Sequence, residues 1–439
     1  MEAAADLAGA AEHGKDDGAT AGRLTYEIFS LLEAKFLFGR RDAARCFPGV
    51  GAAAGHPRGT VCVLSIDGGA RASDGLLAAA ALVRLEAALR RRSGSPAARL
   101  PDFFDAAAGS GAGGVLAAML FARGPRGRPL YAAEDALAFL LRCVRRGSWS
   151  AGVGLVRRGA AFGRAFGELT LRDTVRPVLM PCYDLATRAP FLFSRADAAE
   201  SPAHDFRLRD VCAATCAGGG GAAVDVVSVD GGTRIRAVGG GVALGNPTAA
   251  AITHVLNNRR EFPAAASIDD LLVLSIGTGE PAGGRGGARA PEVARIAAEG
   301  VSDMVDQAVA MAFGHSRTSN YIRIQGTGSR RGGRAPRACG GETREQAVWK
   351  AEAMLLQKGV ESVLFQGRKL AGETNAEKLE RFARDLAREH ARRKQQQVVL
   401  GAVAASPGDG PPAVVSSGGT PTKQTPATTA GSTATKRNA

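Results

Sequence analysis

Residues 103–120, FFDAAAGSGAGGVLAAML, decide the fold that this chain is expected to adopt. An apolar run leads into the glycine-rich centre at residues 109–114, and an Ala/Leu-rich run leads out of it. This order predicts a buried strand, a sharp turn and a helix. Serine hydrolases place a nucleophilic serine at the tip of such a turn, in the pattern G-x-S-x-G, whereas the tip here is Gly111. The stretch is therefore open to three interpretations: a hydrolase turn without its nucleophile, a phosphate-binding loop, or a plain glycine turn.

The bulk composition predicts a globular protein with an affinity for negatively charged surfaces. The chain has 439 residues, of which 45% are hydrophobic and 22% charged, enough for one large or two ordinary domains. Its formal net charge of +14 favours phospholipid or nucleic acid as a partner. No nucleic-acid-binding module is recognisable, so we expect peripheral binding to an acidic membrane and no nucleic acid. The basic clusters by themselves favour solvated helix ends and loops; they include Arg90–Arg92, Arg145–Arg146, Arg157–Arg158, Arg330–Arg331 and Arg392–Lys394.

The seven cysteines are scattered along the chain, and no two of them show the CxxC spacing of a metal or redox site. They are expected to be buried thiols in a reducing compartment, and neither a metal nor a cofactor is predicted. The N-terminus lacks the basic and apolar pattern of a secretion signal. No apolar run approaches the roughly 18 residues that span a bilayer. We therefore expect a cytoplasmic or peripheral membrane protein that is not secreted.

Alternating strand and helix patterns between residues 58 and 280 predict the core of the domain. Short apolar runs such as residues 60–66 and 271–276 are typical of buried strands, and Ala/Leu-rich runs between such strands predict helices. This alternation predicts an α/β fold with a mainly parallel sheet. The expected parts are a flexible N-terminus (1–21), a domain (22–398) that begins with an amphipathic helix (22–40) and ends in a helical part (290–398), and a disordered Ser/Thr/Pro/Gly-rich tail (399–439).

A glycine-rich loop at residues 67–71, DGGAR, follows the first predicted strand, and we call it the first glycine loop. Glycines have no Cβ atom, so they let backbone N–H groups point at an anion, which suits a phosphate and an oxyanion equally. Neither this loop nor residues 109–114 contain the lysine and hydroxyl of a nucleotide P-loop. A dinucleotide-binding fingerprint is also disfavoured, because no acidic residue ends a matching second strand.

Several blocks of the sequence follow one another in a characteristic order. A strand ending in D-G-G (63–69), a strand–turn–helix (103–120) and a glycine triplet leading to N-P (238–247) are joined by the blocks VCAATCA, LLVLSIGTG and NYIRIQ. In this order the chain resembles the patatin-like phospholipase family from about residue 24 to residue 395. The similarity is greatest to a plant branch with G-x-G-x-G in place of G-x-S-x-G. The resemblance implies a three-layer α/β sandwich with a mainly parallel central sheet.

The resemblance also implies where an active site lies. The family uses a serine and an aspartate without a histidine, and backbone N–H groups of the D-G-G loop stabilise the oxyanion. Carried over by position, the nucleophile maps to Gly111 and the acid to Gly239, so neither the serine nor the aspartate is present. The turn at residues 109–113 is here called the elbow. The oxyanion loop maps to Gly68, Gly69, Ala70 and Arg71, and the flanking glycines of the elbow map to Gly109 and Gly113.

Two residues are candidate substitutes for the missing side chains. Ser110 stands one position before the tip of the elbow, and Asp230 begins a literal D-G-G ahead of Gly239. Ser110 is expected to face the sheet or the flank of the helix. Asp230 is expected at a hairpin turn, where Asp-Gly is common for purely local reasons. Either residue would need hydrogen-bond reach to its partner in order to act in catalysis.

Three functions are compatible with these residues. The resemblance implies a lipid acyl hydrolase acting on membrane phospholipids and galactolipids, with the usual dyad replaced and a weak or altered activity. Chemistry favours an inactive lipid- or acyl-binding protein, because losing a catalytic residue costs several powers of ten in rate. An interaction scaffold without a lipid ligand is disfavoured, since it has no need of a glycine-rich oxyanion loop.

Overall fold

The computed structural model describes most of the predicted domain. The described residues are 60–145, 155–218, 223–278, 292–326, 344–362 and 367–404. The predicted flexible N-terminus (1–21), the predicted amphipathic helix (22–40) and the predicted tail from residue 405 onward lie outside these residues. Contacts divide the chain into two units at His390, and the fold described here is that of the first unit.

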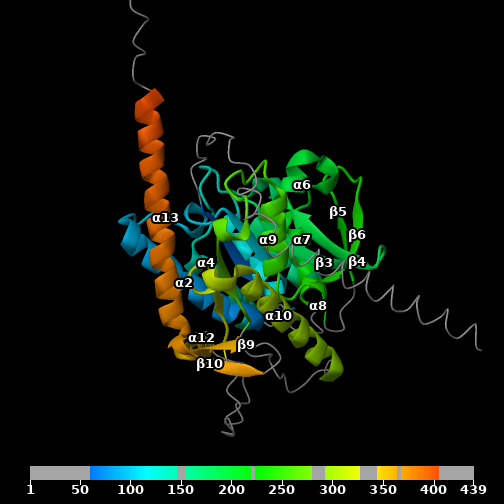
Figure 1. The fold of residues 1–439 in the computed structure, drawn as a ribbon. Helices are drawn as coiled ribbons and strands as arrows, with labels where there is room; N and C mark the ends of the chain where they lie inside the picture. The colour runs from blue at the N-terminus through cyan, green and yellow to red at the C-terminus, as the bar shows by residue number, and fades with distance from the viewer. Residues whose placement is uncertain are drawn as a thin grey trace, which may run out of the picture. The chain divides into compact units, whose positions relative to one another are not determined.

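An eight-stranded sheet forms the centre of the described fold (Figure 1). Its strands follow the order β5-β6-β3-β2-β1-β7-β8, with β4 also paired to β3. The five strands from β3 to β8 in this order are parallel, whereas β4 and β6 run antiparallel to β3, and β5 runs antiparallel to β6. The bounds are β1 (Val61–Ile66), β2 (Ala106–Gly109), β3 (Val178–Asp184), β4 (Ala189–Ser194), β5 (Val224–Val227), β6 (Arg234–Gly239), β7 (Leu271–Ile276) and β8 (Tyr321–Ile324).

Helices pack on both faces of this sheet. The bounds are α2 (Leu76–Ser93), α3 (Gly111–Phe121), α4 (Ala133–Arg145), α5 (Leu155–Phe166), α6 (Arg195–Glu200), α7 (Leu208–Thr215), α8 (Gly240–Ala243), α9 (Thr248–Asn257), α10 (Glu292–Phe313), α11 (Arg317–Asn320), α12 (Arg344–Leu356) and α13 (Asn375–Ala404). A separate hairpin pairs β9 (Lys358–Ser362) with β10 (Arg368–Thr374).

The central strands are buried on both faces because their side chains alternate between two cores. In β1, Cys62, Leu64 and Ile66 pack with α2, α3, α4 and α7, whereas Val61 and Val63 pack with α9 and α10. Continuous apolar strands of this kind require helices on each side of the sheet. The fold is therefore the α/β three-layer sandwich with a mainly parallel sheet, as the sequence predicted.

Helix α13 extends beyond the end that the sequence predicted for the domain. The sequence placed that end at residue 398, and the helix continues to Ala404. Residues 398–404, VVLGAVA, contain no proline, and the first proline after them is Pro407, which explains why the helix is not interrupted earlier. Within the described residues, no helix combines the length and the apolar character needed to cross a bilayer.

Candidate functional site

The elbow joins β2 directly to α3. Ser110 is the N-cap of α3, in extended conformation, and Gly111 is the first residue of the helix, with a φ of +52°. This left-handed conformation is strained for residues with a side chain, and such strain is typical of nucleophile elbows. The elbow thus keeps the backbone bend of a hydrolase, with a glycine at the tip.

The first glycine loop lies against the elbow, backbone to backbone. Strands β1 and β2 are parallel and end side by side, with Ile66 opposite Gly109, so the loops that follow them meet at one edge of the sheet. The Gly69 carbonyl accepts a hydrogen bond of 3.0 Å from the Ala112 N–H. A Cβ atom placed on Gly111 would stand only 2.3 Å from the Gly69 oxygen. The carbonyl of the loop therefore occupies the space into which a side chain at the elbow tip would project.

Ser110 is fully buried between the first glycine loop and Gly245. Its Oγ donates to the carbonyl of Gly245 at 2.9 Å and accepts from the N–H of Gly68 at 3.2 Å. Its exposed fraction is 0%. The hydroxyl of Ser110 therefore links the first glycine loop to residues 239–246, which we call the second glycine segment.

The second glycine segment is also packed at backbone level. A Cβ on Gly239 would stand 1.9 Å from the Ala217 oxygen, and one on Gly240 would stand 2.1 Å from the Pro181 oxygen. Gly241 approaches the first glycine loop, since its Cβ would be 2.9 Å from the Gly68 oxygen. An aspartate at position 239 does not fit this backbone without a shift of the chain.

Asp230 lies in the exposed turn between β5 and β6. Its Oδ1 accepts hydrogen bonds from the Ser228 hydroxyl at 2.7 Å and from the Gly232 N–H at 2.9 Å, and these bonds lower the pKa of the carboxyl group. The turn precedes β6, which begins at Arg234 and ends at Gly239. At about 3.3 Å per residue, the two ends of β6 lie about 17 Å apart. The structure therefore does not bring Asp230 to Gly239, where the resemblance implies the acid, and its substitute role stays a prediction.

Arg71, the last residue of the first glycine loop, is held locally. Its backbone N–H donates to Asp74 Oδ2 at 3.1 Å, and its side chain lies 3.7 Å from Asp74 Oδ1. Gly113 lies in the first turn of α3, where a Cβ would stand 2.3 Å from the Ile66 oxygen. The loop and the elbow are thus closely packed on each side of Gly111.

A buried ion pair beneath the first glycine loop was missed from the sequence. Arg323 in β8 donates to both carboxylate oxygens of Asp67, at 3.1 and 2.5 Å. Burial raises the pKa of Asp67, and the positive charge of Arg323 opposes that change. Burial alone would lower the pKa of Arg323, but Asp67 outweighs it and the pKa is raised. The available signal was the block NYIRIQ, which contains Arg323 but does not indicate its partner.

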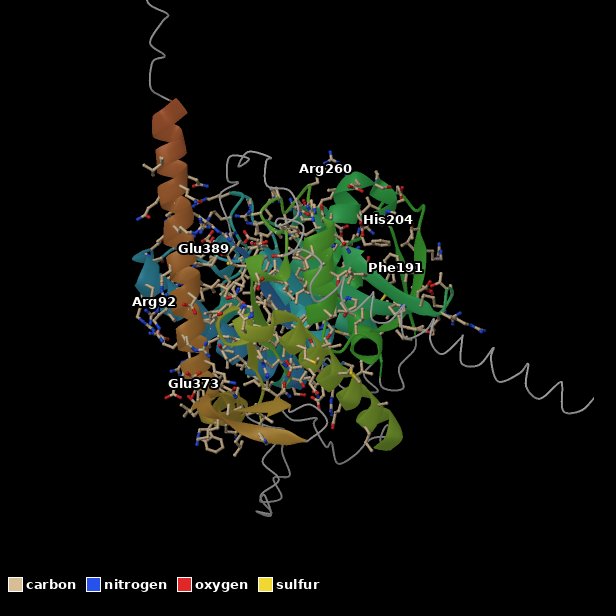
Figure 2. The ribbon with its side chains drawn as sticks, viewed as in Figure 1. Arg92, Phe191, His204, Arg260, Glu373 and Glu389 are labelled. Carbon is tan, nitrogen blue, oxygen red and sulfur yellow. The ribbon has the colours of Figure 1, made fainter. Side chains whose placement is uncertain are left out.

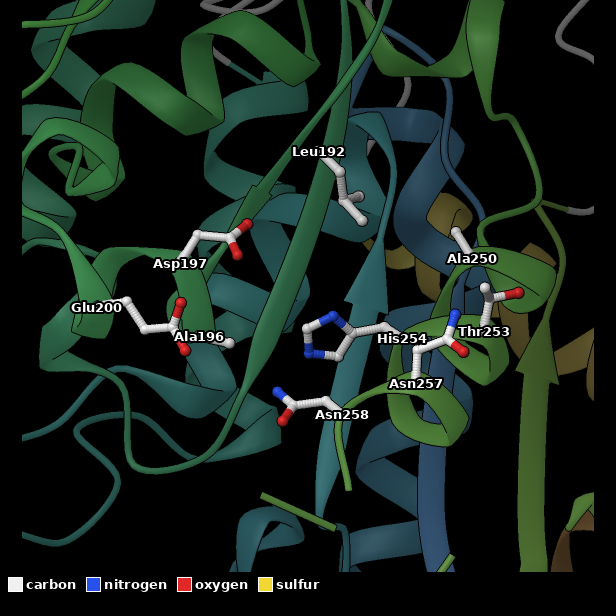
Figure 3. A pocket seen from close by; sticks show the side chains of 9 residues that line it. All are labelled: Leu192, Ala196, Asp197, Glu200, Ala250, Thr253, His254, Asn257 and Asn258. Atoms are coloured by element: carbon white, nitrogen blue, oxygen red, sulfur yellow. The ribbon is translucent and has the colours of Figure 1, made fainter. Parts of the chain in front are cut away.

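A separate groove lies between α6, α9 and β4, where Figure 3 shows the His254 ring pointing from α9 toward α6. Its volume is about 540 Å³, and its lining residues include Leu192, Asp197, Glu200 and His254. The Nε2 atom of His254 is buried and has no hydrogen-bond partner. Burial lowers the pKa of His254, and the nearby Asp197 opposes that change. Among the described residues, no group of three or more His, Cys, Asp or Glu side chains is placed to hold a metal ion.

Comparison with known proteins identifies the family of the chain. No family model matches the sequence. Patatin-like protein 3 of Oryza sativa is 72% identical over 399 residues, covering 88% of this chain and 94% of that protein. Patatin-like protein 7 of Arabidopsis thaliana is 46% identical, covering 85% of this chain and 82% of the relative. The Arabidopsis protein named Probable inactive patatin-like protein 9 is 40% identical, covering 83% and 92%. The chain therefore belongs to the plant patatin-like family, a family of lipid hydrolases.

Proposed function

We propose that this protein hydrolyses acyl esters of membrane glycerolipids, both phospholipids and galactolipids, slowly and without a side-chain nucleophile. The observation that supports this most directly is the left-handed conformation of Gly111 at the tip of an elbow between β2 and α3. That geometry places the N-terminus of α3 beside a glycine loop, which is the arrangement that stabilises an oxyanion.

The proposed reaction uses water as the nucleophile. Water attacks the acyl carbon and loses a proton to solvent, and the carbonyl oxygen takes up the negative charge. The carbonyl then re-forms as the bond to the lipid alcohol breaks, and the alcohol oxygen takes a proton from solvent, which leaves the free fatty acid. Backbone N–H groups of the loop and of the first turn of α3 stabilise the charge once the Gly69 carbonyl has moved off the N–H of Ala112. Serine proteases that lack their catalytic residues retain about 10³–10⁴-fold catalysis over water through oxyanion stabilisation and binding alone. A residual rate of this order is what we propose here.

Positive charge supports a peripheral association with the membrane. The chain carries a formal net charge of +14. Arg260 lies at the surface of the described structure, and so does Arg92, which forms an ion pair with Glu380 (Figure 2). Arginines near an anionic lipid surface each contribute about 1 kcal/mol of binding, so several together hold a protein at the interface.

A second candidate is a lipid-binding protein without turnover. The contact between the Gly69 carbonyl and the Gly111 position favours it, because the loop fills the space of the missing nucleophile. The name of the 40% identical Arabidopsis relative, Probable inactive patatin-like protein 9, points the same way.

Fatty-acid release from vesicles distinguishes these functions. The wild type, Ser110→Ala and Asp230→Ala are incubated with vesicles of mixed anionic phospholipid and galactolipid, with vesicle co-sedimentation measured in parallel. We expect slow release above the lipid blank, retained within about tenfold in both variants, because losing a true nucleophile costs several powers of ten.

Other results decide against this mechanism. Loss of release in a folded Ser110→Ala or Asp230→Ala protein would show that a side chain performs the chemistry. Vesicle binding without any fatty-acid release by the wild type would establish the second candidate. Gly111→Ser tests the loop movement that the mechanism requires, and a gain of several powers of ten would show that the first glycine loop moves aside for a serine.

A further inference from the structure

The buried ion pair between Asp67 and Arg323 connects two strands that are not neighbours in the sheet. Asp67 follows β1, Arg323 lies in β8, and β7 runs between them. The two side chains are only 6% and 10% exposed, and the guanidinium contacts both carboxylate oxygens. A bidentate geometry restricts the orientation of the carboxylate as well as its position.

Asp67 is the side-chain anchor of the first glycine loop. Its own N–H donates to the Ile276 carbonyl at 2.8 Å. The next two residues, Gly68 and Gly69, have no side chains with which to hold the loop in place. Their backbone atoms contact the elbow, through Ser110 Oγ and the N–H of Ala112. The position of the Asp67 carboxylate therefore determines how the loop meets the elbow.

The same arginine reaches the second glycine segment by another route. Arg323 Nη1 donates to the Ser275 hydroxyl at 2.6 Å, and Ser275 Oγ lies 2.8 Å from Thr248 Oγ1. Thr248 Oγ1 is 2.6 Å from Asn246 Oδ1, at the end of the second glycine segment. All of these groups are buried or nearly so. Both glycine-rich segments are thus connected to one guanidinium.

The charges around the pair make Arg323 necessary to it. Burial of Asp67 raises the pKa of its carboxyl group, and the negative charge of Asp306 in α10 raises this pKa further. Tyr321 in β8 donates to Asp306 Oδ1 at 2.5 Å. Arg323 is the cation that compensates this buried acidic environment, and a buried carboxylate without its partner is strongly disfavoured.

We propose that Arg323 is a positioning residue that holds both glycine-rich segments against the elbow, through Asp67 on one side and Ser275 on the other. It sets the approach of the Gly69 carbonyl to Gly111. Only the kinetic part of its test rests on the proposed function.

Hydrogen exchange of the loop amides provides the test. The variants are Arg323→Met, which keeps a long side chain without the charge, and Arg323→Lys, which keeps the charge but cannot form the bidentate pair with Asp67. The matched control is Arg128→Met, since Arg128 forms another bidentate pair, with Asp102, at 2.8 and 2.9 Å. In Arg323→Met we expect the amide exchange rates of residues 67–71 and 239–246 to rise at least tenfold, with the amides of α2 as the internal reference. The rise should be smaller in Arg323→Lys and absent in Arg128→Met.

Several outcomes would overturn the proposal. Unchanged loop exchange in folded Arg323→Met, or an equal rise in Arg128→Met, would do so. If Arg323→Met does not fold, Arg323→Lys alone tests the proposal. Amide exchange at the wild-type rate in both residues 67–71 and 239–246 of Arg323→Lys would then refute the positioning role. Where the wild type releases fatty acid, kcat should change at least tenfold in Arg323→Lys with KM within twofold, and a change in KM alone would contradict the proposal. A wild type without turnover refutes the proposed function and leaves the exchange result intact.

Discussion

The elbow and the groove between α6 and α9 differ in what they offer a ligand. At the elbow, backbone atoms fill the space: the Gly69 oxygen stands where a side chain of residue 111 would begin, and Ser110 is fully buried. The groove has about 540 Å³ of space and several polar side chains, including His254 with its unpartnered Nε2. Helix α9 lines the groove through His254, and Thr248 at its start bonds to Asn246 of the second glycine segment. A hydrolase bend can therefore persist where backbone atoms fill the space of its nucleophile.

The largest effect on the free energy of unfolding is expected for Gly111→Ala, which places a methyl group in the closely packed elbow. The new Cβ would meet the Gly69 oxygen at 2.3 Å, and the left-handed backbone adds its own strain. Together these predict a loss of about 2–5 kcal/mol in the free energy of unfolding, measured by urea denaturation. Gly127→Ala is the control, because Gly127 is also left-handed but has nothing within 4 Å of its Cβ position. It should lose only about 1–2 kcal/mol, and equal losses in the two variants would mean that the loop yields readily.

A smaller effect is expected for Ser110→Ala, which removes the hydroxyl between the glycine-rich segments. The N–H of Gly68 and the carbonyl of Gly245 would both lose a buried partner. The expected loss is about 1–3 kcal/mol in the free energy of unfolding. Ser201→Ala is a suitable comparison, since its hydroxyl caps a short surface helix by accepting from Ala203. A Ser110→Ala protein as stable as the wild type would contradict the proposed link.

The smallest effect concerns the groove and depends on pH. Burial lowers the pKa of His254 below its ordinary value of 6.5 in the folded protein. Below pH 6.5 the unfolded chain binds a proton that the folded chain does not, so stability falls as the pH falls. His254→Gln should remove this part of the decline when melting temperatures are compared between pH 7.5 and pH 5.5. An unchanged pH dependence would show that the His254 ring is solvated in the groove.

The fold was largely predictable because its signals are local. The runs VCVLSI and LLVLSI are apolar throughout, and in the structure they are buried on both faces as β1 and β7. The glycine-rich bend after β2 and the Asp-Gly turn before β6 were also visible in the sequence, since each depends on the conformations that a few adjacent residues adopt. The extension of α13 to Ala404 was not predicted, because flanking Ser, Thr and Pro residues obscured a short apolar run that continues the helix.

The sequence by itself showed that glycines stand at positions 111 and 239, where the resemblance implies a serine and an aspartate, and which backbone bends those glycines permit. Only the tertiary structure decided what lies over them. The Gly69 carbonyl reaches Gly111 because two parallel strands end together, and Arg323 reaches Asp67 across 256 positions of sequence. Contacts of this kind depend on strand order and register, to which no local pattern of residues corresponds. The turn that holds Asp230 was predicted from the sequence, and the structure adds that β6 separates it from Gly239.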